Sequence, residues 1–326
     1  MNYSVTDVTV DGGTLRVGCW DSADVAAGAP VRHGVLALHG ITASHLSWAP
    51  VGRLLTAGDG VRVIAPDLRG RGRSSELPGP AGMPRHADDA AAALAAFGLA
   101  GVCVLGHSMG GFAAVVFAAR HAQLTSGLVL VDGGVPIPLP PGMSPEQAVQ
   151  ATLGPAADRL RMSFASRAEY QEFWRVHPAL AESWNADIAA YVDYDLVGTE
   201  PRLRSSCSYD AVAQDSGQLG NDGTLLAAWD QLDQDICFLQ APLGLLGGLP
   251  PLYPPGALDD WARRVPGFQW EQLPGTNHYT ITLAEPGASA VAERVTSVLR
   301  RTPLPAAARS GRSSAPRSAP DAPATS

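Results

Sequence analysis

The stretch that decides the fold is Val102-Cys103-Val104-Leu105-Gly106-His107-Ser108-Met109-Gly110-Gly111. Its first four residues are a short apolar run, typical of a strand that is buried on both faces. The next five, Gly-His-Ser-Met-Gly, match G-x-S-x-G, a pattern in which glycines allow a sharp, strained bend that leaves the serine hydroxyl exposed above the strand end. Small apolar residues then continue at helical spacing to Arg120. The stretch therefore predicts a strand, a tight turn and a helix that begins beneath Ser108.

Ser108 has two interpretations. In an acyl-transfer enzyme the turn presents the nucleophile, and the first amides of the helix favour negative charge beside it. Alternatively, the turn is a glycine-rich strand-to-helix connection whose serine only caps the helix. The motif is short, so the rest of the chain has to decide between the two.

The composition is that of a globular protein with a sizeable core. The chain has 326 residues, of which 46% are hydrophobic and 17% charged, enough for one large α/β domain with an insertion or for two domains. The net charge of −8 at pH 7 argues against a nucleic-acid or anionic-membrane partner. All 23 basic residues are arginine, which excludes lysine-based chemistry such as a Schiff base or a P-loop.

We expect a cytoplasmic protein. The four cysteines show no paired spacing and are expected to be free thiols in a reducing compartment: Cys19, Cys103, Cys207 and Cys237. The first residues, MNYSVTDVTVDGG, lack the basic and apolar regions of a signal peptide. No apolar run is long enough to span a bilayer.

Strands and helices alternate over residues 1–134, the first part of the predicted core. A β-hairpin is expected around Asp11-Gly12-Gly13, from residues 5–10 and 14–20. Buried strands are predicted at residues 34–38, 61–65, 102–105 and 128–131. This alternation is typical of a mostly parallel sheet covered by helices on both faces. Chemistry in such sheets gathers at the carboxyl ends of the strands, where the sequence places His39, Asp67, Ser108 and Asp132.

Residues 135–235 break the alternation and are predicted to form an inserted helical cap over the strand ends. Most of their aromatic side chains are expected to pack within the cap, and a few to line a pocket: Tyr170, Phe173, Trp174, Trp184, Tyr191, Tyr194 and Trp229. The second part of the core is predicted at 236–301, with strands at 236–247 and 267–273 and helices at 256–264 and 284–300. Residues 302–326, rich in Ala, Pro, Ser and Arg, are predicted to be a disordered tail.

Five segments together resemble the α/β-hydrolase superfamily, in particular its cap-bearing esterases, lipases and C–C bond hydrolases. The segments are LALHGITAS, APDLRGRGRSS, VLGHSMGG, LVLVDGG and GTNHYT, and the resemblance extends over residues 5–300. It implies an α/β-hydrolase fold, with a mostly parallel central sheet, flanking helices and an inserted cap. It also favours the nucleophile interpretation of Ser108.

The resemblance implies a role for three further residues. A serine hydroxyl needs a general base, and His278 follows the last strand of the core, where the family places its histidine. The other seven histidines have simpler interpretations: His39 belongs to the His-Gly turn, His107 flanks the serine turn, His33 precedes a strand, and the rest are surface or helix residues, namely His45, His86, His121 and His177. An oxyanion hole needs two backbone N–H groups. These are expected from Met109, directly after the nucleophile, and from Ile41, in the loop that follows His39-Gly40.

In this family the serine and the histidine work with a third residue, an acid that orients the imidazole, and the three form a catalytic triad. This acid is where the sequence departs from the family pattern. Most relatives carry an aspartate in a G-x-x-D loop after the strand that follows the cap, but this loop reads Gly247-Gly248-Leu249-Pro250-Pro251-Leu252-Tyr253 here. Some members place the acid one strand earlier, and that position is Asp132, which keeps the chain order Ser, Asp, His. Asp132 is therefore the predicted acid, and Asp259 or Asp260 are the alternatives. The competing interpretation gives Asp132 only a structural role.

The sequence thus predicts a carboxylesterase-like serine hydrolase that cleaves an ester, thioester or lactone of a small, uncharged, hydrophobic substrate. No His/Cys/Asp/Glu cluster has metal-ligand spacing, so no metal or cofactor is expected. Asp67 and Arg69 are interpreted as structural, either paired with each other or capping their loop. A C–C bond hydrolase, an acyltransferase and a hydrolase-like binding protein without turnover remain as alternatives.

Overall fold

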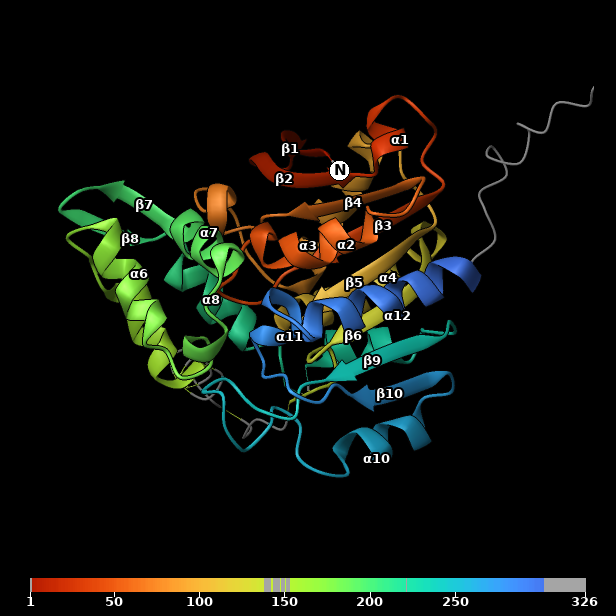
Figure 1. Ribbon diagram of the computed structural model, residues 1–326. Helices are drawn as coiled ribbons and strands as arrows, with labels where there is room; N and C mark the ends of the chain where they lie inside the picture. The colour runs from red at the N-terminus through yellow and green to blue at the C-terminus, as the bar shows by residue number, and fades with distance from the viewer. Residues whose placement is uncertain are drawn as a thin grey trace, which may run out of the picture.

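A computed structural model describes residues 2–137, 142, 147, 150, 153–220 and 222–301, so the predicted tail at 302–326 lies outside the described residues. An eight-stranded sheet runs through the molecule, and helices cover it (Figure 1). The strand order is β1-β2-β4-β3-β5-β6-β9-β10. The strands are β1 (Asn2–Val10), β2 (Gly13–Asp21), β3 (His33–Leu38), β4 (Val61–Pro66), β5 (Val102–His107), β6 (Thr125–Val131), β9 (Ile236–Gln240) and β10 (Phe268–Gln272).

The sheet is mostly parallel, as the alternation of strands and helices predicts. Every pair from β4 to β10 is parallel, whereas β1–β2 and β2–β4 are antiparallel. The predicted hairpin supplies the antiparallel edge, with Val10 paired to Gly13 across its turn. The α/β class with a mostly parallel central sheet is therefore confirmed.

One predicted strand is too long. The apolar run 236–247 suggested a single strand, but β9 ends at Gln240. The next amide, that of Ala241, donates to the Asp132 carboxylate at 3.2 Å. Pro242 follows and has no N–H to offer a neighbouring strand, so the ladder cannot continue.

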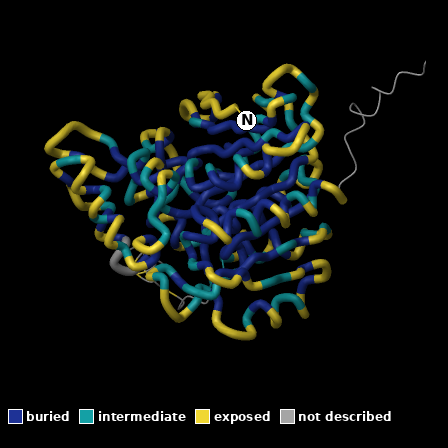
Figure 2. Tube along the Cα trace, viewed as in Figure 1, coloured by how far each residue is buried: buried dark blue, intermediate teal, exposed yellow. Residues whose placement is uncertain are grey.

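Both faces of the sheet are apolar, and each face has its own set of helices. In β5, Val102 and Val104 belong to one hydrophobic cluster, and Cys103 and Leu105 to the other, because successive side chains of a strand point to opposite faces. Helices α3, α4, α9 and α10 pack on the first cluster, and α2 and α12 on the second. Figure 2 shows the resulting buried centre, with exposed residues concentrated at the rim.

The helices follow the predicted alternation with small shifts in their bounds. The α-helices of the core are α1 (Ala23–Ala26), α2 (Ala49–Leu55), α3 (Met83–Ala96), α4 (Met109–Arg120), α9 (Gly223–Trp229), α10 (Ala257–Arg264), α11 (Thr280–Leu283) and α12 (Gly287–Arg301). Helix α9 falls within the segment 135–235 that was predicted as the cap, but it packs on α4, and its Trp229 contacts Trp261 and Phe268 of the core. Short 3₁₀ turns are η1 (His45–Trp48), η2 (Gly72–Ser74) and η3 (Ala122–Leu124). No helix among the described residues is long and apolar enough to cross a membrane.

The segment predicted as a cap projects from one end of the sheet, at the left of Figure 1. It contains η4 (Gly154–Arg161), α6 (Arg167–Arg175), η5 (Ala181–Ser183), α7 (Ala186–Asp195) and α8 (Tyr209–Ser216). A short antiparallel hairpin, β7 (Leu196–Thr199) and β8 (Arg202–Ser205), lies among these helices, although the sequence pattern suggested helices alone. An aromatic cluster that includes Tyr170, Trp174 and Tyr191 forms its interior.

Candidate active site

Ser108 stands on the tight turn between β5 and α4. Its backbone has φ 53° and ψ −126°, an unfavourable region for a residue with a side chain, and its amide donates to the Val131 carbonyl at 3.0 Å. The glycines of the motif are needed for space. A Cβ at Gly106 would lie 2.3 Å from the Gly110 carbonyl oxygen, and one at Gly110 would lie 2.0 Å from the Leu38 carbonyl oxygen. The close approach of strand and helix thus forces the bend that exposes the hydroxyl.

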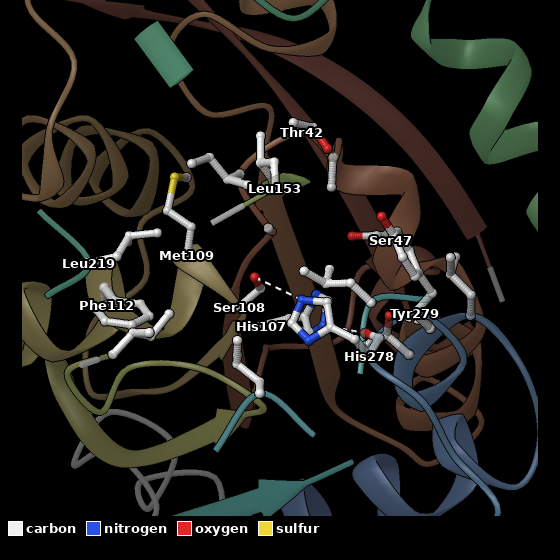
Figure 3. Close-up of a pocket in the computed structure, with 18 of the residues that line it drawn as sticks. Thr42, Ser47, His107, Ser108, Met109, Phe112, Leu153, Leu219, His278 and Tyr279 are labelled. Carbon is white, nitrogen blue, oxygen red and sulfur yellow. Dashed lines mark hydrogen bonds between the residues drawn. The ribbon is translucent and has the colours of Figure 1, made fainter. Parts of the chain in front are cut away.

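His278 lies within hydrogen-bond distance of Ser108, as the dashed line in Figure 3 marks. Its Nε2 is 3.0 Å from the Ser108 Oγ. It belongs to the loop between β10 and α11, where its amide donates to the Leu243 carbonyl at 3.1 Å. The imidazole is almost fully buried, so bulk water does not compete for its two nitrogens.

Asp132 lies on the other side of the same imidazole. Its Oδ2 is 2.6 Å from the His278 Nδ1, and its Oδ1 accepts from the Ala241 amide at 3.2 Å. The residue follows β6 directly and has φ 45°, so it and Ser108 are the described non-glycine residues with positive φ. An aspartate tolerates this conformation better than most residues. The structure therefore brings Ser108, His278 and Asp132 into one hydrogen-bonded chain.

The alternative acids lie elsewhere. Asp259 accepts from the Trp270 indole N–H at 3.1 Å, and Asp260 pairs with Arg263, in both cases on the exposed side of α10. In the loop after β9, where most relatives carry the acid, Leu249 is 80% exposed. Neither of the two alternative acids contacts His278.

The two residues predicted to form an oxyanion hole line the same pocket as Ser108. Met109 is the first residue of α4, so its amide has no acceptor within the helix. Ile41 lies in the loop after β3, and this loop passes close to the serine, since a Cβ at Gly40 would be 3.3 Å from the Ser108 Cβ. Both residues are buried. Their placement around Ser108 matches the prediction, and their catalytic role remains a prediction.

His107 has a role that sequence reasoning missed. Its Nε2 lies 2.8 Å from the His278 carbonyl oxygen, so it carries the proton and donates, and the two rings lie 4.8 Å apart. Burial holds the pKa of His107 well below its usual value, which keeps the ring neutral. His107 thus supports the backbone of His278 from 171 residues away in sequence. The one sequence signal for His107 was its position next to Ser108, and this position does not predict a bond to the His278 backbone.

Asp67 and Arg69 do not pair with each other. Asp67 accepts from the His45 imidazole at 2.7 Å and from the amides of His45 and Arg73, so it organises the loops at this strand end. Burial opposes its ionisation, but His45 lowers the pKa of Asp67 to about 2. Arg69 pairs instead with Asp89 at 2.9 Å. Of the two structural interpretations of Asp67, the one in which it caps its loop is confirmed. His45, interpreted as a surface or helix residue, is the first residue of the short helix η1 and is fully buried, so it is not a surface residue.

The pocket over Ser108 is mainly apolar. Figure 3 shows Met109, Phe112 and Leu219 on one side of the serine and Ser47 and Tyr279 on the other. The cap segment contributes Leu153, Tyr191 and Leu219, so of the cap aromatics predicted as candidates Tyr191 lines this pocket. No arginine, aspartate or glutamate occurs among its described lining residues. Nor do the described residues contain a group of three or more His, Cys, Asp or Glu side chains that could hold a metal ion.

Comparison with known proteins identifies relatives of this chain. Residues 35–282 match the family model described as alpha/beta hydrolase fold. The chain is 35% identical over 146 residues to N-formylmaleamate deformylase of Pseudomonas putida, a match that covers 43% of this chain and 54% of that one. More generally, the chain spans about half or less of the length of such curated relatives.

Two solved structures share the fold at 20% sequence identity. E-2-(acetamidomethylene)succinate hydrolase superposes with a TM-score of 0.71, over 92% of this chain and 100% of that one. The thioesterase domain from the curacin biosynthetic pathway superposes with a TM-score of 0.70, over 91% of this chain and 100% of that one. At this identity the likeness concerns the fold alone.

Proposed function

The chain belongs to the alpha/beta hydrolase fold family, and from this premise we propose that it is a serine hydrolase that cleaves an ester-type bond of a small hydrophobic substrate. One observation carries the proposal: a single chain of hydrogen bonds joins the Ser108 hydroxyl, the His278 imidazole and the Asp132 carboxylate. A serine that only caps a helix needs neither partner. The strained φ of Ser108 gives the same support, because such strain persists where the surrounding structure enforces it.

In the proposed first step, the Ser108 Oγ attacks the substrate carbonyl carbon while His278 Nε2 takes the hydroxyl proton. The carbonyl oxygen becomes an oxyanion, which the amides of Ile41 and Met109 stabilise. The intermediate collapses as His278 returns its proton to the leaving alcohol or thiol, and the acyl group stays on Ser108. Water then attacks the acyl-enzyme carbonyl carbon while His278 takes a proton from it. The second intermediate collapses as His278 returns the proton to Ser108, which releases the carboxylic acid product and restores the serine.

Asp132 supports both halves of this cycle without giving up its own charge. By accepting from Nδ1–H it selects the tautomer in which Nε2 is free to take the serine proton. It also stabilises the imidazolium that forms after proton transfer. The amide of Ala241 holds the carboxylate from behind, so its direction toward His278 is set before substrate binds.

The pocket supports an uncharged, largely apolar substrate. A charged group would lose its hydration there without an arginine or carboxylate among the described lining residues to compensate. An apolar acyl group fits beside Phe112 and Leu219, and the leaving group belongs on the side of His278, which must protonate it. Tyr191 and Tyr279 are also among the residues that line the pocket.

The class of bond that the protein cleaves is tested with a panel of substrates. The similarity to a deformylase favours testing N-formyl and amide substrates beside esters, and the thioesterase fold neighbour favours thioesters. C–C bond hydrolysis and acyl transfer use the same scaffold. A panel of p-nitrophenyl esters, thioesters, lactones, N-formyl amides and β-diketones, matched in acyl chain, ranks these classes by kcat/KM.

The decisive experiment treats the purified protein with a fluorophosphonate and follows intact mass, beside the variant Ser108→Ala. We expect stoichiometric labelling of the wild type and none of Ser108→Ala, because only an activated serine reacts fast. A folded wild type that takes no label, or a Ser108→Ala variant that labels equally well, contradicts the proposal and favours a ligand-binding protein.

A further inference from the structure

Arg71 is a fully buried arginine that contacts both residues of the predicted oxyanion hole. Its Nε donates to the Ile41 carbonyl at 2.8 Å, and its Nη2 lies 3.7 Å from the Met109 Sδ. Its Nη1 donates to the Arg69 carbonyl at 2.9 Å. One rigid guanidinium therefore spans the loop after β3 and the first residue of α4, which approach Ser108 from different strands.

This arrangement matters because an oxyanion hole depends on position. Two amides stabilise the developing charge only when both point at the same place, and misplacement by about 1 Å costs on the order of 10²-fold in rate. The Ile41 loop has no helix to hold it, so the hydrogen bond from Arg71 to its carbonyl supplies a fixed point. Met109 is held by α4, and the sulfur atom of its side chain contacts the Arg71 guanidinium.

The charge of Arg71 is balanced from the cap. Its Nη1 lies 2.5 Å from the Asp215 Oδ2, and Asp215 belongs to α8. The same carboxylate accepts from the Gly82 amide at 2.7 Å and from the His86 imidazole at 3.0 Å. Burial acts to raise the pKa of Asp215, but His86 and Arg71 outweigh it and hold this pKa below its usual value. An arginine buried here without Asp215 would be an uncompensated charge.

The start of α8 docks on the same loop as Arg71. The Ser208 amide donates to the Gly70 carbonyl at 2.8 Å, and a Cβ at Gly70 would lie 2.5 Å from the Cβ of Ala211. Gly70 itself has φ 82°. The cap therefore meets the core at the residue before Arg71, so the position of α8 and the position of the guanidinium are set together.

We propose that Arg71 is a positioning residue for the oxyanion hole and that Asp215 of the cap holds it in place. The proposal rests on the proposed function, since it assigns a task within that reaction. It makes the cap part of the catalytic geometry: α8 fixes Arg71 through the buried ion pair, and Arg71 fixes Ile41 relative to Met109.

Arg69 provides a matched control in the same loop. It is also buried and also paired with a carboxylate, that of Asp89, and it donates to the Asp11 carbonyl. Its guanidinium contacts neither Ile41 nor Met109. Replacing either arginine with methionine removes the buried arginine partner of one carboxylate, Asp215 or Asp89. The two variants therefore share this loss of a buried ion pair and differ in the contact to the oxyanion residues.

The test compares Arg71→Met with Arg69→Met and the wild type. For Arg71→Met we expect kcat to fall about 10- to 100-fold while KM stays within about threefold, because the contact acts on the transition state. A trifluoromethyl ketone adds to Ser108 and places an oxyanion in the hole, whereas the corresponding secondary alcohol cannot. If Arg71 positions the hole, Arg71→Met weakens binding of the ketone more than that of the alcohol. The ratio of the ketone inhibition constant to the alcohol inhibition constant should therefore rise for Arg71→Met and stay at the wild-type value for Arg69→Met.

Two further variants keep the test decisive if Arg71→Met does not fold. Arg71→Lys retains a charge for Asp215 but has no planar fork to reach Ile41 and Met109 together, so the same change in ratio is expected. Asp215→Asn should show a smaller change in the same direction. An unchanged ratio in folded Arg71→Lys, or equal changes in the two methionine variants, overturns the Arg71 proposal. If the wild type fails to react with the fluorophosphonate, the proposed function itself falls.

Discussion

The loops after β6 and β9 leave neighbouring parallel strands at the same edge of the sheet, yet they differ in what they bring to His278. The β6 loop carries Asp132 at a positive φ, buried and bonded to the imidazole. The β9 loop carries no acid, and its Leu249 faces solvent. The contrast shows that in this chain the carboxylate beside His278 comes from the β6 strand end and not from the β9 strand end. The amide of Ala241, from the β9 side, still binds the carboxylate that the β6 side supplies.

Asp132→Asn tests this comparison most strongly. We expect kcat to fall by about 10⁴-fold, because an amide at this position stabilises the wrong imidazole tautomer and gives the imidazolium no charge partner. Steady-state kinetics on the best ester, together with the rate of fluorophosphonate labelling and a thermal melt, measures the effect. Full activity in a folded Asp132→Asn variant would place the acid elsewhere and remove the contrast between the loops.

A matched pair of glycines extends the comparison to packing. A Cβ at Gly133, after β6, would lie 2.1 Å from the Ser108 carbonyl oxygen, whereas one at Gly248, after β9, would meet nothing within 4 Å. Gly133→Ala should therefore destabilise the fold by about 3 kcal/mol and slow labelling of Ser108. Gly248→Ala should change stability by less than about 0.5 kcal/mol. Urea unfolding measures the free energy of unfolding of both variants. Equal losses of stability in the two variants would mean that the two loops are packed alike.

A smaller effect than that of Gly133→Ala is expected at the link between the two loops. The Tyr253 hydroxyl, from the β9 loop, donates to the Val135 carbonyl at 2.8 Å, and the residue is buried. Tyr253→Phe leaves that carbonyl unpaired, so we expect a loss of about 1–2 kcal/mol in the free energy of unfolding. Activity should persist, since Tyr253 contacts none of the reacting groups. An unchanged free energy of unfolding would show that the loops are held independently.

The parts of the molecule that local sequence patterns determine were predictable. The strand and helix around Ser108 follow from four apolar residues, a glycine motif and small helical residues, and the structure has them at these positions. The prediction of Asp132 as the acid came from the resemblance to the family, some of whose members carry the acid one strand earlier, together with the missing acid after β9. For the strand and helix around Ser108, neighbouring residues along the chain carry the information.

Contacts between distant residues were not predictable. The bond from His107 to the His278 carbonyl joins the last residue of β5 to the loop between β10 and α11, and no local pattern around either residue indicates it. The end of β9 depends on an amide taken by Asp132, which lies 109 residues earlier. The β7–β8 hairpin has strands of only four residues each, too short for period-two alternation to stand out among helices.

The acid's location before the cap has a consequence for how the enzyme can be divided. Ser108, Asp132, Ile41 and Met109 all precede the inserted segment, and only His278 follows it. In the proposed mechanism, a break within the insertion would yield one half with the proposed nucleophile, acid and both oxyanion amides, and another half that contributes the proposed base. Neither half is then expected to turn over alone, so recovered activity would report that the two halves have reassembled, which makes this chain a candidate for a split-enzyme sensor.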